Sequence, residues 1–256
     1  MLSFRGIASA TNDVSHKGEA AMKKGKTIEA EVSGYISGLL RTHFGKGPTS
    51  VFVAIRRPFV IIHLREFLAP TEKVLMNQHE AKRVQEIRDL LMADLNSRIK
   101  MDLLKSVELD IKDIYADWNL ENKTGLLILV LDGEGTEDDS EWPKDIDNKA
   151  FYQEIIDISK EAQKEPEKTG VYWLNPRTVL IRREGIMIEI EKELIKNNFT
   201  EQLKLAKRPL ESKLIYNSSL EQILNRNIAE VFTDWNFTED IGYIVLLLDP
   251  ERENGD

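Results

Sequence analysis

The spacing of hydrophobic residues changes in a regular order along the first half of the chain. Apolar side chains recur every three or four residues over 27–44, which predicts a helix with one buried face. Glycines and a proline follow at 45–48 and predict its end. Two short runs of β-branched and aromatic residues, 51–55 and 59–64, then flank Pro58 and predict a β-hairpin.

A second helix and a second hairpin complete the pattern. Three-to-four spacing returns over about 71–104, and Pro70-Thr71-Glu72 is a start signal because proline is tolerated in a first helical turn. Strand-like runs at 107–118 and 125–132 predict another hairpin. The unit therefore has the order α-β-β-α-β-β.

The same order occurs twice. Asp117-Trp118-Asn119 recurs 117 positions later as Asp234-Trp235-Asn236. Farther upstream the offset is 118: Pro48 corresponds to Pro166, and Arg65-Glu66 to Arg183-Glu184. Several matching groups in consistent order indicate a tandem duplication of one folding unit.

The second repeat resembles the first, with one difference. Lys196-Asn197-Asn198 and Pro209 interrupt the apolar spacing, so we expect its long helix to be broken. The other expected elements are a helix over 150–162, a hairpin of 171–174 with 178–181 around Asn175-Pro176, and a closing hairpin of 228–235 with 242–249. The predicted fold class is α+β, a tandem repeat of the α-β-β-α-β-β unit with antiparallel sheets covered by helices.

The repeat sets the expected domain boundaries. The acid-rich segment between the repeats is most simply a solvated loop. The expected parts are a flexible N-terminal tail over 1–24, a first repeat over 25–132, an acidic linker over 133–147, a second repeat over 148–250 and a tail over 251–256.

The closing strand of each repeat contains six consecutive apolar residues, 126–131 and 243–248. Such a strand has no polar face, so both of its faces must be covered. Helices can cover one face of each sheet. The other face requires the sheet of the sibling repeat or a second chain, which predicts face-to-face sheets within the molecule or a dimer.

Composition narrows the functional classes. The chain has 256 residues and a formal net charge of −9, which disfavours binding to nucleic acid or anionic lipid. It has no cysteine, which excludes disulfides, thiolate nucleophiles and metal sites with cysteine ligands. The apolar runs are too short for a membrane helix, and the N-terminal residues lack the apolar core of a secretory signal. A cytoplasmic protein without membrane insertion is expected.

The first repeat resembles the MpsC family, the small soluble component named after a bacterial sodium-translocating, membrane-potential-generating system. Gly47-Pro48 before the hairpin, the segment 68–73 that opens the long helix, and the segment from Ile114 to Asp117 before Thr124-Gly125 carry the resemblance. The second repeat is similar but lacks the Gly-Pro and Pro-Thr-Glu signatures. The resemblance implies a bacterial cytoplasmic protein linked to ion or inorganic-carbon transport, with a membrane transporter subunit as one partner. It supplies no catalytic residues.

Asp117 and Asp234 are candidate site residues. They could be paired carboxylates, one per repeat, near a shared two-fold-like interface, and an enzyme could use them. Alternatively, the Asp or Asn side chains cap turns through local backbone hydrogen bonds. The structural alternative is favoured, and it applies to the whole signature: Asp117, Trp118, Asn119, Asp234, Trp235 and Asn236.

Five arginines concentrate near the first hairpin of each repeat. They could receive a planar oxyanion such as bicarbonate or phosphate, because guanidinium groups match its geometry; alternatively, they are edge-strand charges that discourage aggregation. The five are Arg56, Arg57, Arg65, Arg182 and Arg183.

The sequence shows no Walker motif, no nucleophile elbow and no zinc-hydrolase motif. We therefore expect a non-enzymatic accessory or regulatory protein without metal or cofactor, acting through a protein partner or as a homo-oligomer. The alternative is a small-molecule or anion sensor with its site at the junction of the two repeats.

Overall fold

The computed structural model describes residues 27–133 and 142–250. The expected tails at 1–24 and 251–256, and most of the expected linker, lie outside the described residues. Within the described part of the chain, two α+β repeats follow each other in the predicted order.

The first repeat forms one four-stranded antiparallel sheet with strand order β1-β2-β4-β3. Its helices are α1 (Ile28–Phe44), α2 (Pro70–Asn77) and α3 (Ala81–Val107), and its strands are β1 (Ser50–Arg56), β2 (Phe59–Arg65), β3 (Ile111–Asn119) and β4 (Thr124–Leu131).

The second repeat forms the same sheet, with strand order β5-β6-β8-β7. Its helices are α4 (Asn148–Ala162), α5 (Glu189–Lys196), α6 (Thr200–Tyr216) and α7 (Leu220–Leu224), and its strands are β5 (Lys168–Asn175), β6 (Thr178–Glu184), β7 (Ile228–Asn236) and β8 (Ile241–Leu248). The predicted fold class is confirmed.

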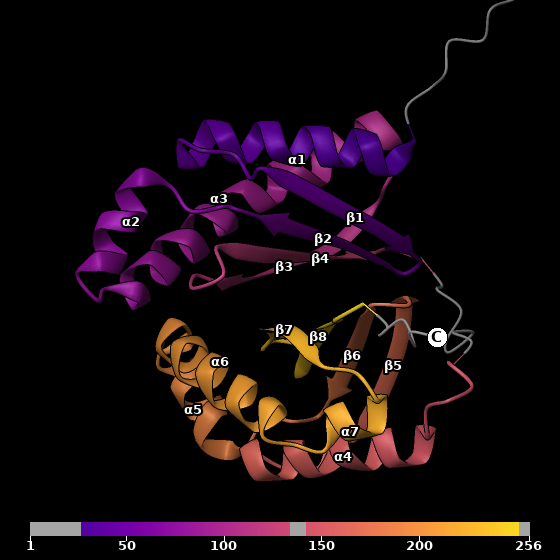
Figure 1. Cartoon of the computed structure of the whole chain (residues 1–256). Coiled ribbons are helices and arrows are strands. Elements are labelled where there is room, and N and C mark those ends of the chain that lie inside the picture. Colours follow the sequence, from indigo (N-terminus) through magenta and orange to yellow (C-terminus); the bar gives the residue numbers. More distant parts are fainter. Residues whose placement is uncertain (1–26, 134–141, 251–256) are drawn as a thin grey trace, which may run out of the picture.

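The two sheets pack face to face between two outer layers of helices (Figure 1). Side chains from both sheets form one shared apolar layer, which includes Phe59 and Tyr115 from the first repeat and Phe232 and Tyr243 from the second. Each repeat also has its own core between its sheet and its helices. The sibling sheet therefore covers the apolar closing strands, which was one of the two predicted solutions.

The first helix of the first repeat begins and ends where the sequence predicts; that of the second repeat ends at Ala162 as expected but begins at Asn148, two residues before the expected start. The Thr27 hydroxyl accepts a hydrogen bond from the Ala30 N–H, and Gly45 ends α1 with φ 71°. Such a left-handed terminal residue favours glycine. In the second repeat, the Asp147 carboxylate accepts from the N–H groups of Lys149 and Ala150 at the start of α4.

The prediction of an unbroken long helix in the first repeat is wrong. The chain leaves the helix after Asn77 and resumes at Ala81, because His79 adopts φ 59°. Asn198 takes the same conformation, φ 64°, between α5 and α6, so the break belongs to both repeats. The predicted break at Pro209 is also wrong, since α6 continues through it to Tyr216.

The alignment of the repeats needs one correction. Trp173 and Asn175 of β5 oppose Val179 and Thr178, so Leu174 is an extra, bulged residue. Beyond this bulge the offset between repeats is 119 rather than 118. Arg183 therefore corresponds to Leu64 and not to Arg65, and each of the two pairs with the glycine of its closing strand.

Candidate functional site

Asp117 and Asp234 lie where β3 and β7 cross, and each binds the backbone of the other repeat. The Thr233 N–H donates to Asp117 Oδ2 at 2.7 Å, and the Ala116 N–H donates to Asp234 Oδ2 at 2.9 Å. The second oxygen of each carboxylate accepts from the N–H of the tryptophan that follows it, at 2.8 Å in both repeats. The two aspartates thus form a reciprocal clamp between the repeats, which we call the junction.

The asparagines of the signature contact their own turns. Asn119 Oδ1 accepts from the Asn122 N–H at 3.0 Å. Asn236 Oδ1 accepts from the N–H groups of Thr238 and Glu239. Local turn bonds therefore come from the asparagines, whereas the aspartates join one repeat to the other.

Helix α6 adds two cations to the junction. Arg208 binds both oxygens of Asp89, with N–O distances of 2.7 and 3.1 Å, and its Nε lies 3.2 Å from Asp117 Oδ1. Lys204 Nζ lies 3.0 Å from Asp234 Oδ1. Because three carboxylates face two cations, the junction has an excess of one negative charge when all groups are ionised.

Asp117 is only 7% exposed. Burial raises the pKa of Asp117 to about 6, against the opposing effects of Arg208 and of the N–H donors of Thr233 and Trp118. A carboxyl group with this pKa takes up a proton under mildly acidic conditions. The junction can therefore change its charge without any ligand.

A second polar contact crosses between the sheets at Glu230 of β7. Its carboxylate binds His63 Nε2 at 3.0 Å, Asn122 Nδ2 at 3.1 Å and the Thr124 hydroxyl, all from the first repeat. Burial raises the pKa of Glu230, but the hydrogen bonds from His63, Thr124 and Asn122 together outweigh it, so the pKa lies below its ordinary value. This contact adds a second polar clamp between the repeats.

Each repeat also buries a cation beneath its signature tryptophan. In the first repeat, fully buried Arg88 donates to both oxygens of Glu72, at 2.8 and 2.7 Å, and to the Phe67 carbonyl at 2.8 Å. The guanidinium carbon lies 4.6 Å from the Phe67 ring centre and 4.7 Å from that of Trp118. Glu72 also accepts from the Ala69 N–H at the start of α2.

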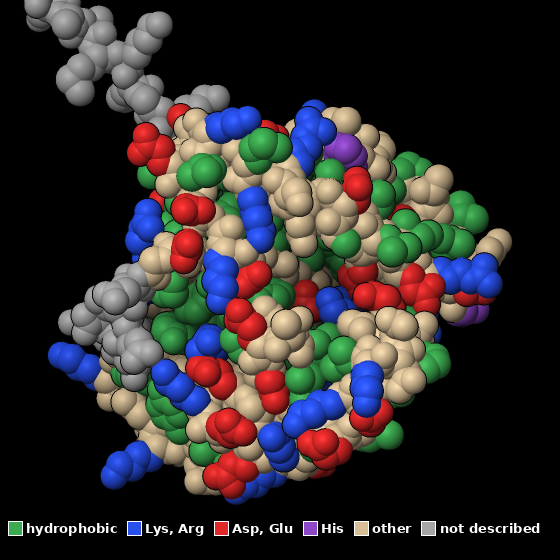
Figure 2. Space-filling view, turned by 180° about the vertical axis from the view of Figure 1, so that it is seen from behind, with side chains coloured by type: hydrophobic (Ala, Val, Ile, Leu, Met, Phe, Trp, Pro, Cys, Tyr) green, Lys and Arg blue, Asp and Glu red, His purple; other side chains and the backbone are tan. Residues whose placement is uncertain are grey.

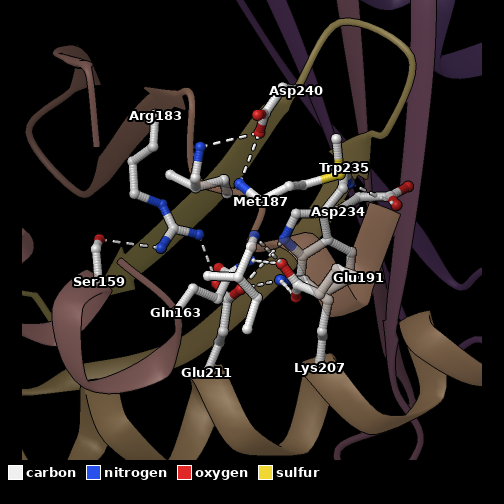
Figure 3. A network of polar contacts seen from close by, with 12 residues as sticks. Ser159, Gln163, Arg183, Met187, Glu191, Lys207, Glu211, Asp234, Trp235 and Asp240 are labelled. Carbon is white, nitrogen blue, oxygen red and sulfur yellow. Dashed lines mark hydrogen bonds and ion pairs between the residues drawn. The ribbon is translucent and has the colours of Figure 1, made fainter. Parts of the chain in front are cut away.

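In the second repeat a larger network occupies this place (Figure 3). Lys207 Nζ lies 2.8 Å from Glu191 and 3.4 Å from Glu211, and Arg183 lies 2.5 Å from Glu211. Burial raises the pKa of Glu211, but Arg183 and Lys207 outweigh it and hold the pKa below its ordinary value. The remaining contacts join Ser159 to Arg183, Gln163 to Glu191, and the Trp235 indole N–H to Glu211.

The two cations and two carboxylates of this network balance, as Arg88 and Glu72 do in the first repeat. A buried cluster with balanced charge and internal hydrogen bonds is a structural element rather than a receptor for a charged ligand. The junction, with its unbalanced charge, is the better candidate for a functional role.

The tryptophans explain the paired glycines of the repeat. Trp118 lies opposite Gly125, and Trp235 lies opposite Gly242. A Cβ atom at position 125 would lie 2.4 Å from Trp118 Cε3. The ring therefore requires a residue without a side chain across the strand pair.

The five candidate arginines do not gather in one site. Arg56 donates to the Trp173 carbonyl of the other repeat at 2.8 Å, and Arg57 is exposed at the hairpin turn. Arg65 is exposed at the opposite end of β2. Arg182 pairs with Glu184, and Arg183 lies in the buried network.

Sequence reasoning missed the cations that the helices bury. Arg88 lies four residues after Val84 and four before Met92, both of which face the core. Lys207 follows the buried Leu203 at the same distance, and Arg208 is the next residue. In both helices a charged residue occupies a position where the three-to-four spacing predicts a buried apolar residue, and this feature of the sequence could have revealed the buried cations.

Across residues 27–133 and 142–250, no group of three or more His, Cys, Asp or Glu side chains is arranged to hold a metal ion. The same residues include no helix with the length and apolar character that crossing a membrane requires.

The fold and the junction define a class of protein: a fused pair of α+β units that pack sheet to sheet through a shared polar clamp. The chain belongs to the family described as "Na+-translocating membrane potential-generating system (MpsC)", which matches residues 24–133 and 148–250. Each repeat is thus matched by the family. The match includes the second repeat, which keeps Glu191 in place of Glu72 although its Pro-Thr-Glu signature is lost.

One relative is the "Uncharacterized protein YbcI" of Bacillus subtilis (strain 168). It is 30% identical over 111 residues, which are 43% of this chain and 88% of the relative. The similarity thus covers most of the relative but less than half of this chain. No solved structure matches the chain.

Proposed function

We propose that this protein is a non-enzymatic accessory or regulatory protein that acts through protein–protein contacts and is linked to ion or inorganic-carbon transport. The description of the family as a membrane-potential-generating system supports an association with a membrane system. Within that association, this chain would be a cytoplasmic component whose membrane partners are other polypeptides.

The proposal rests on the contacts of the signature residues that both repeats share. Asp117 and Asp234 use their oxygens on backbone N–H groups and on Arg208 and Lys204. The tryptophans cover the glycines of the closing strands. Because these residues hold the two repeats together, they support a scaffold more than they support an acid–base pair.

The helix layers supply the outer surface of this scaffold. Several of their apolar side chains are largely exposed, among them Val74 on α2 and Ile190 on α5. Exposed apolar side chains that gather on one surface are typical of protein-binding sites. The contacts of an accessory protein would therefore lie on the helices, away from the junction.

This proposal is tested by co-expressing the full chain with the membrane polypeptides encoded beside its gene and purifying from detergent extracts. We expect the chain to elute with at least one of them in a fixed ratio. A chain that elutes alone in every combination would contradict the proposal.

A second candidate function is a sensor for a small molecule or anion. A cleft of about 1370 Å³ at one end of the sandwich is lined by Arg56 of the first repeat and by Trp142, Lys144 and Arg226. A ligand at 100 times its dissociation constant stabilises a protein by about 2.7 kcal/mol. Thermal unfolding with bicarbonate, phosphate and nucleotides tests this candidate, and an unchanged midpoint with all three would rule it out.

A further inference from the structure

Helix α3 has a regular row of residues on the side that faces away from its core. Its buried residues include Val84, Arg88 and Leu95, whereas a second row with alternating spacings of three and four lies on the opposite side. This spacing is the one along which two helices pack as a coiled coil. We call this row the outer stripe: Ile87, Leu90, Asp94, Ser97, Met101 and Leu104.

The outer stripe is exposed. Its four apolar side chains are between 46% and 67% exposed, and Asp94 and Ser97 are exposed as well. From behind, hydrophobic side chains gather over the end of the first repeat that carries α2 and the start of α3 (Figure 2). No element of the described chain covers this face of α3.

The shared fold does not require the stripe. In α6, Ala206 and Pro209 occupy the places of Ile87 and Leu90, and Lys213 occupies that of Asp94. The second repeat folds in the same way without an apolar row there. The row on α3 therefore has a role that is separate from folding the unit.

The order of residues in the stripe reads the same in both directions: two apolar, two polar, two apolar. Two such helices in antiparallel orientation place Ile87 against Leu104, Leu90 against Met101, and Asp94 against Ser97. A parallel pair in register would instead place Asp94 against Asp94, where like charges repel. A single polar position in such a seam fixes register and orientation.

We propose that the outer stripe is the docking surface for α3 of a second molecule of this chain, in antiparallel orientation about a two-fold axis. An interface of this kind uses the same residues on both molecules, which the palindromic order allows. The stripe extends over 18 residues, or roughly 27 Å of helix. Contacts of this size lie near the lower limit for specific interfaces, so the dimer has a dissociation constant in about the micromolar range or above.

This dimer is independent of the proposed function, because it needs only the purified chain. Sedimentation velocity of the full chain at increasing concentration should show a shift from monomer to dimer. Leu90→Glu should weaken this association at least about tenfold, since it places two charges in the apolar seam. Ile190→Glu, at a site 62% exposed on α5, is the matched control and should leave it unchanged.

Ser97→Lys tests the orientation. In the antiparallel dimer, the introduced lysine of each molecule faces Asp94 of the other, so two ion pairs form and association strengthens about twofold to tenfold. In a parallel dimer the two lysines would face each other and weaken it. A weaker dimer for this variant would therefore overturn the proposed orientation.

Disulfide trapping gives a second readout, because the chain has no cysteine of its own. A mixture of Asp94→Cys and Ser97→Cys chains should form mixed cross-links faster than either variant alone. A chain that stays monomeric at all concentrations, or a dimer that Leu90→Glu leaves intact, would overturn the proposal and assign the stripe to another occupant.

Discussion

The two repeats bury a cation at the same place but surround it with different side chains. Arg88 of the first repeat lies against the rings of Phe67 and Trp118 and pairs with one carboxylate. Lys207 of the second repeat lies between Glu191 and Glu211. Lys207 also lies 5.1 Å from the centre of the Trp235 ring. The same place in the fold therefore holds a buried cation with one carboxylate and several rings, or with two carboxylates and one ring.

The difference between the repeats is a coordinated set of replacements. Where the first repeat has the buried pair Leu64 and Met92, the second has the ion pair Arg183 and Glu211. The first helix also differs. Its buried positions correspond at an offset of 119, so Ser159 and Gln163 stand where the first repeat has Leu40 and Phe44. A buried charge is tolerated only with its partner, so these changes are expected to depend on one another.

Breaking the polar pair should have the largest effect. Glu211→Met leaves Arg183 buried without its carboxylate and should lower the free energy of unfolding by about 3–5 kcal/mol. Adding Arg183→Leu restores the apolar pair of the first repeat and should recover most of this loss. Urea unfolding of both variants measures the coupling between the two positions.

The exposed pair Lys192 and Glu189 provides the control for this cycle. Glu189→Met should leave the unfolding midpoint unchanged. A double variant that is no more stable than Glu211→Met would show that the apolar pair of the first repeat cannot replace the ion pair of the second.

The glycines beneath the tryptophans should respond unequally. Gly125→Ala would bring Cβ within 2.4 Å of the Trp118 ring, which Phe67 and Arg88 hold in place, and should cost about 2–3 kcal/mol. At Gly242 the nearest atom is the flexible end of Ile186 at 2.6 Å, so about 1 kcal/mol is expected there.

Gly38 serves as the reference for these two variants, because an added Cβ meets nothing within 4 Å inside α1. Gly38→Ala should stabilise the protein slightly in the same urea experiment. Equal losses at positions 125 and 242 would indicate that the Ile186 side chain is held as rigidly as the Trp118 ring.

The sequence predicted the repeat and the element order, because both depend on local patterns. It also offered face-to-face sheets as one solution, because the apolar runs 126–131 and 243–248 must be buried. The break at His79 could not be predicted, since a non-glycine residue with positive φ has no reliable sequence signal. The bulge at Leu174 was hidden for a similar reason. It shifts the register of the repeats without changing the apolar pattern.

Only part of the junction could be predicted from the sequence. The recurrence of Asp117 and Asp234 identified the two carboxylates and a two-fold-like interface as one interpretation. Their partners could not be predicted, because the Thr233 and Ala116 N–H groups lie more than a hundred residues away in sequence. Arg208 was hidden within the pattern of α6.

The smallest predicted effect concerns the pH dependence of the junction, where Asp117 contacts Arg208 and its counterpart Asp234 contacts Lys204. The pKa of Asp117 is about 6 in the folded protein, above the value of about 3.9 for an unfolded chain. The folded state therefore binds more protons between these values, so its stability rises as the pH falls. From pH 7 to pH 5 the gain should be about 1 kcal/mol.

Asp117→Asn removes this gain, whereas Asp110→Asn, at an exposed site, keeps it. Urea unfolding at pH 7 and pH 5 gives the change in the free energy of unfolding for the wild type and for each variant. Subtracting the change in the variant from that in the wild type cancels the contributions of the other titrating groups. Glu211 and Glu230 act in the opposite direction, but only at lower pH, because their pKa values lie below the ordinary range. A pH dependence that persists in Asp117→Asn would place the titrating group outside the junction, and the clamp between the repeats would then have a constant charge.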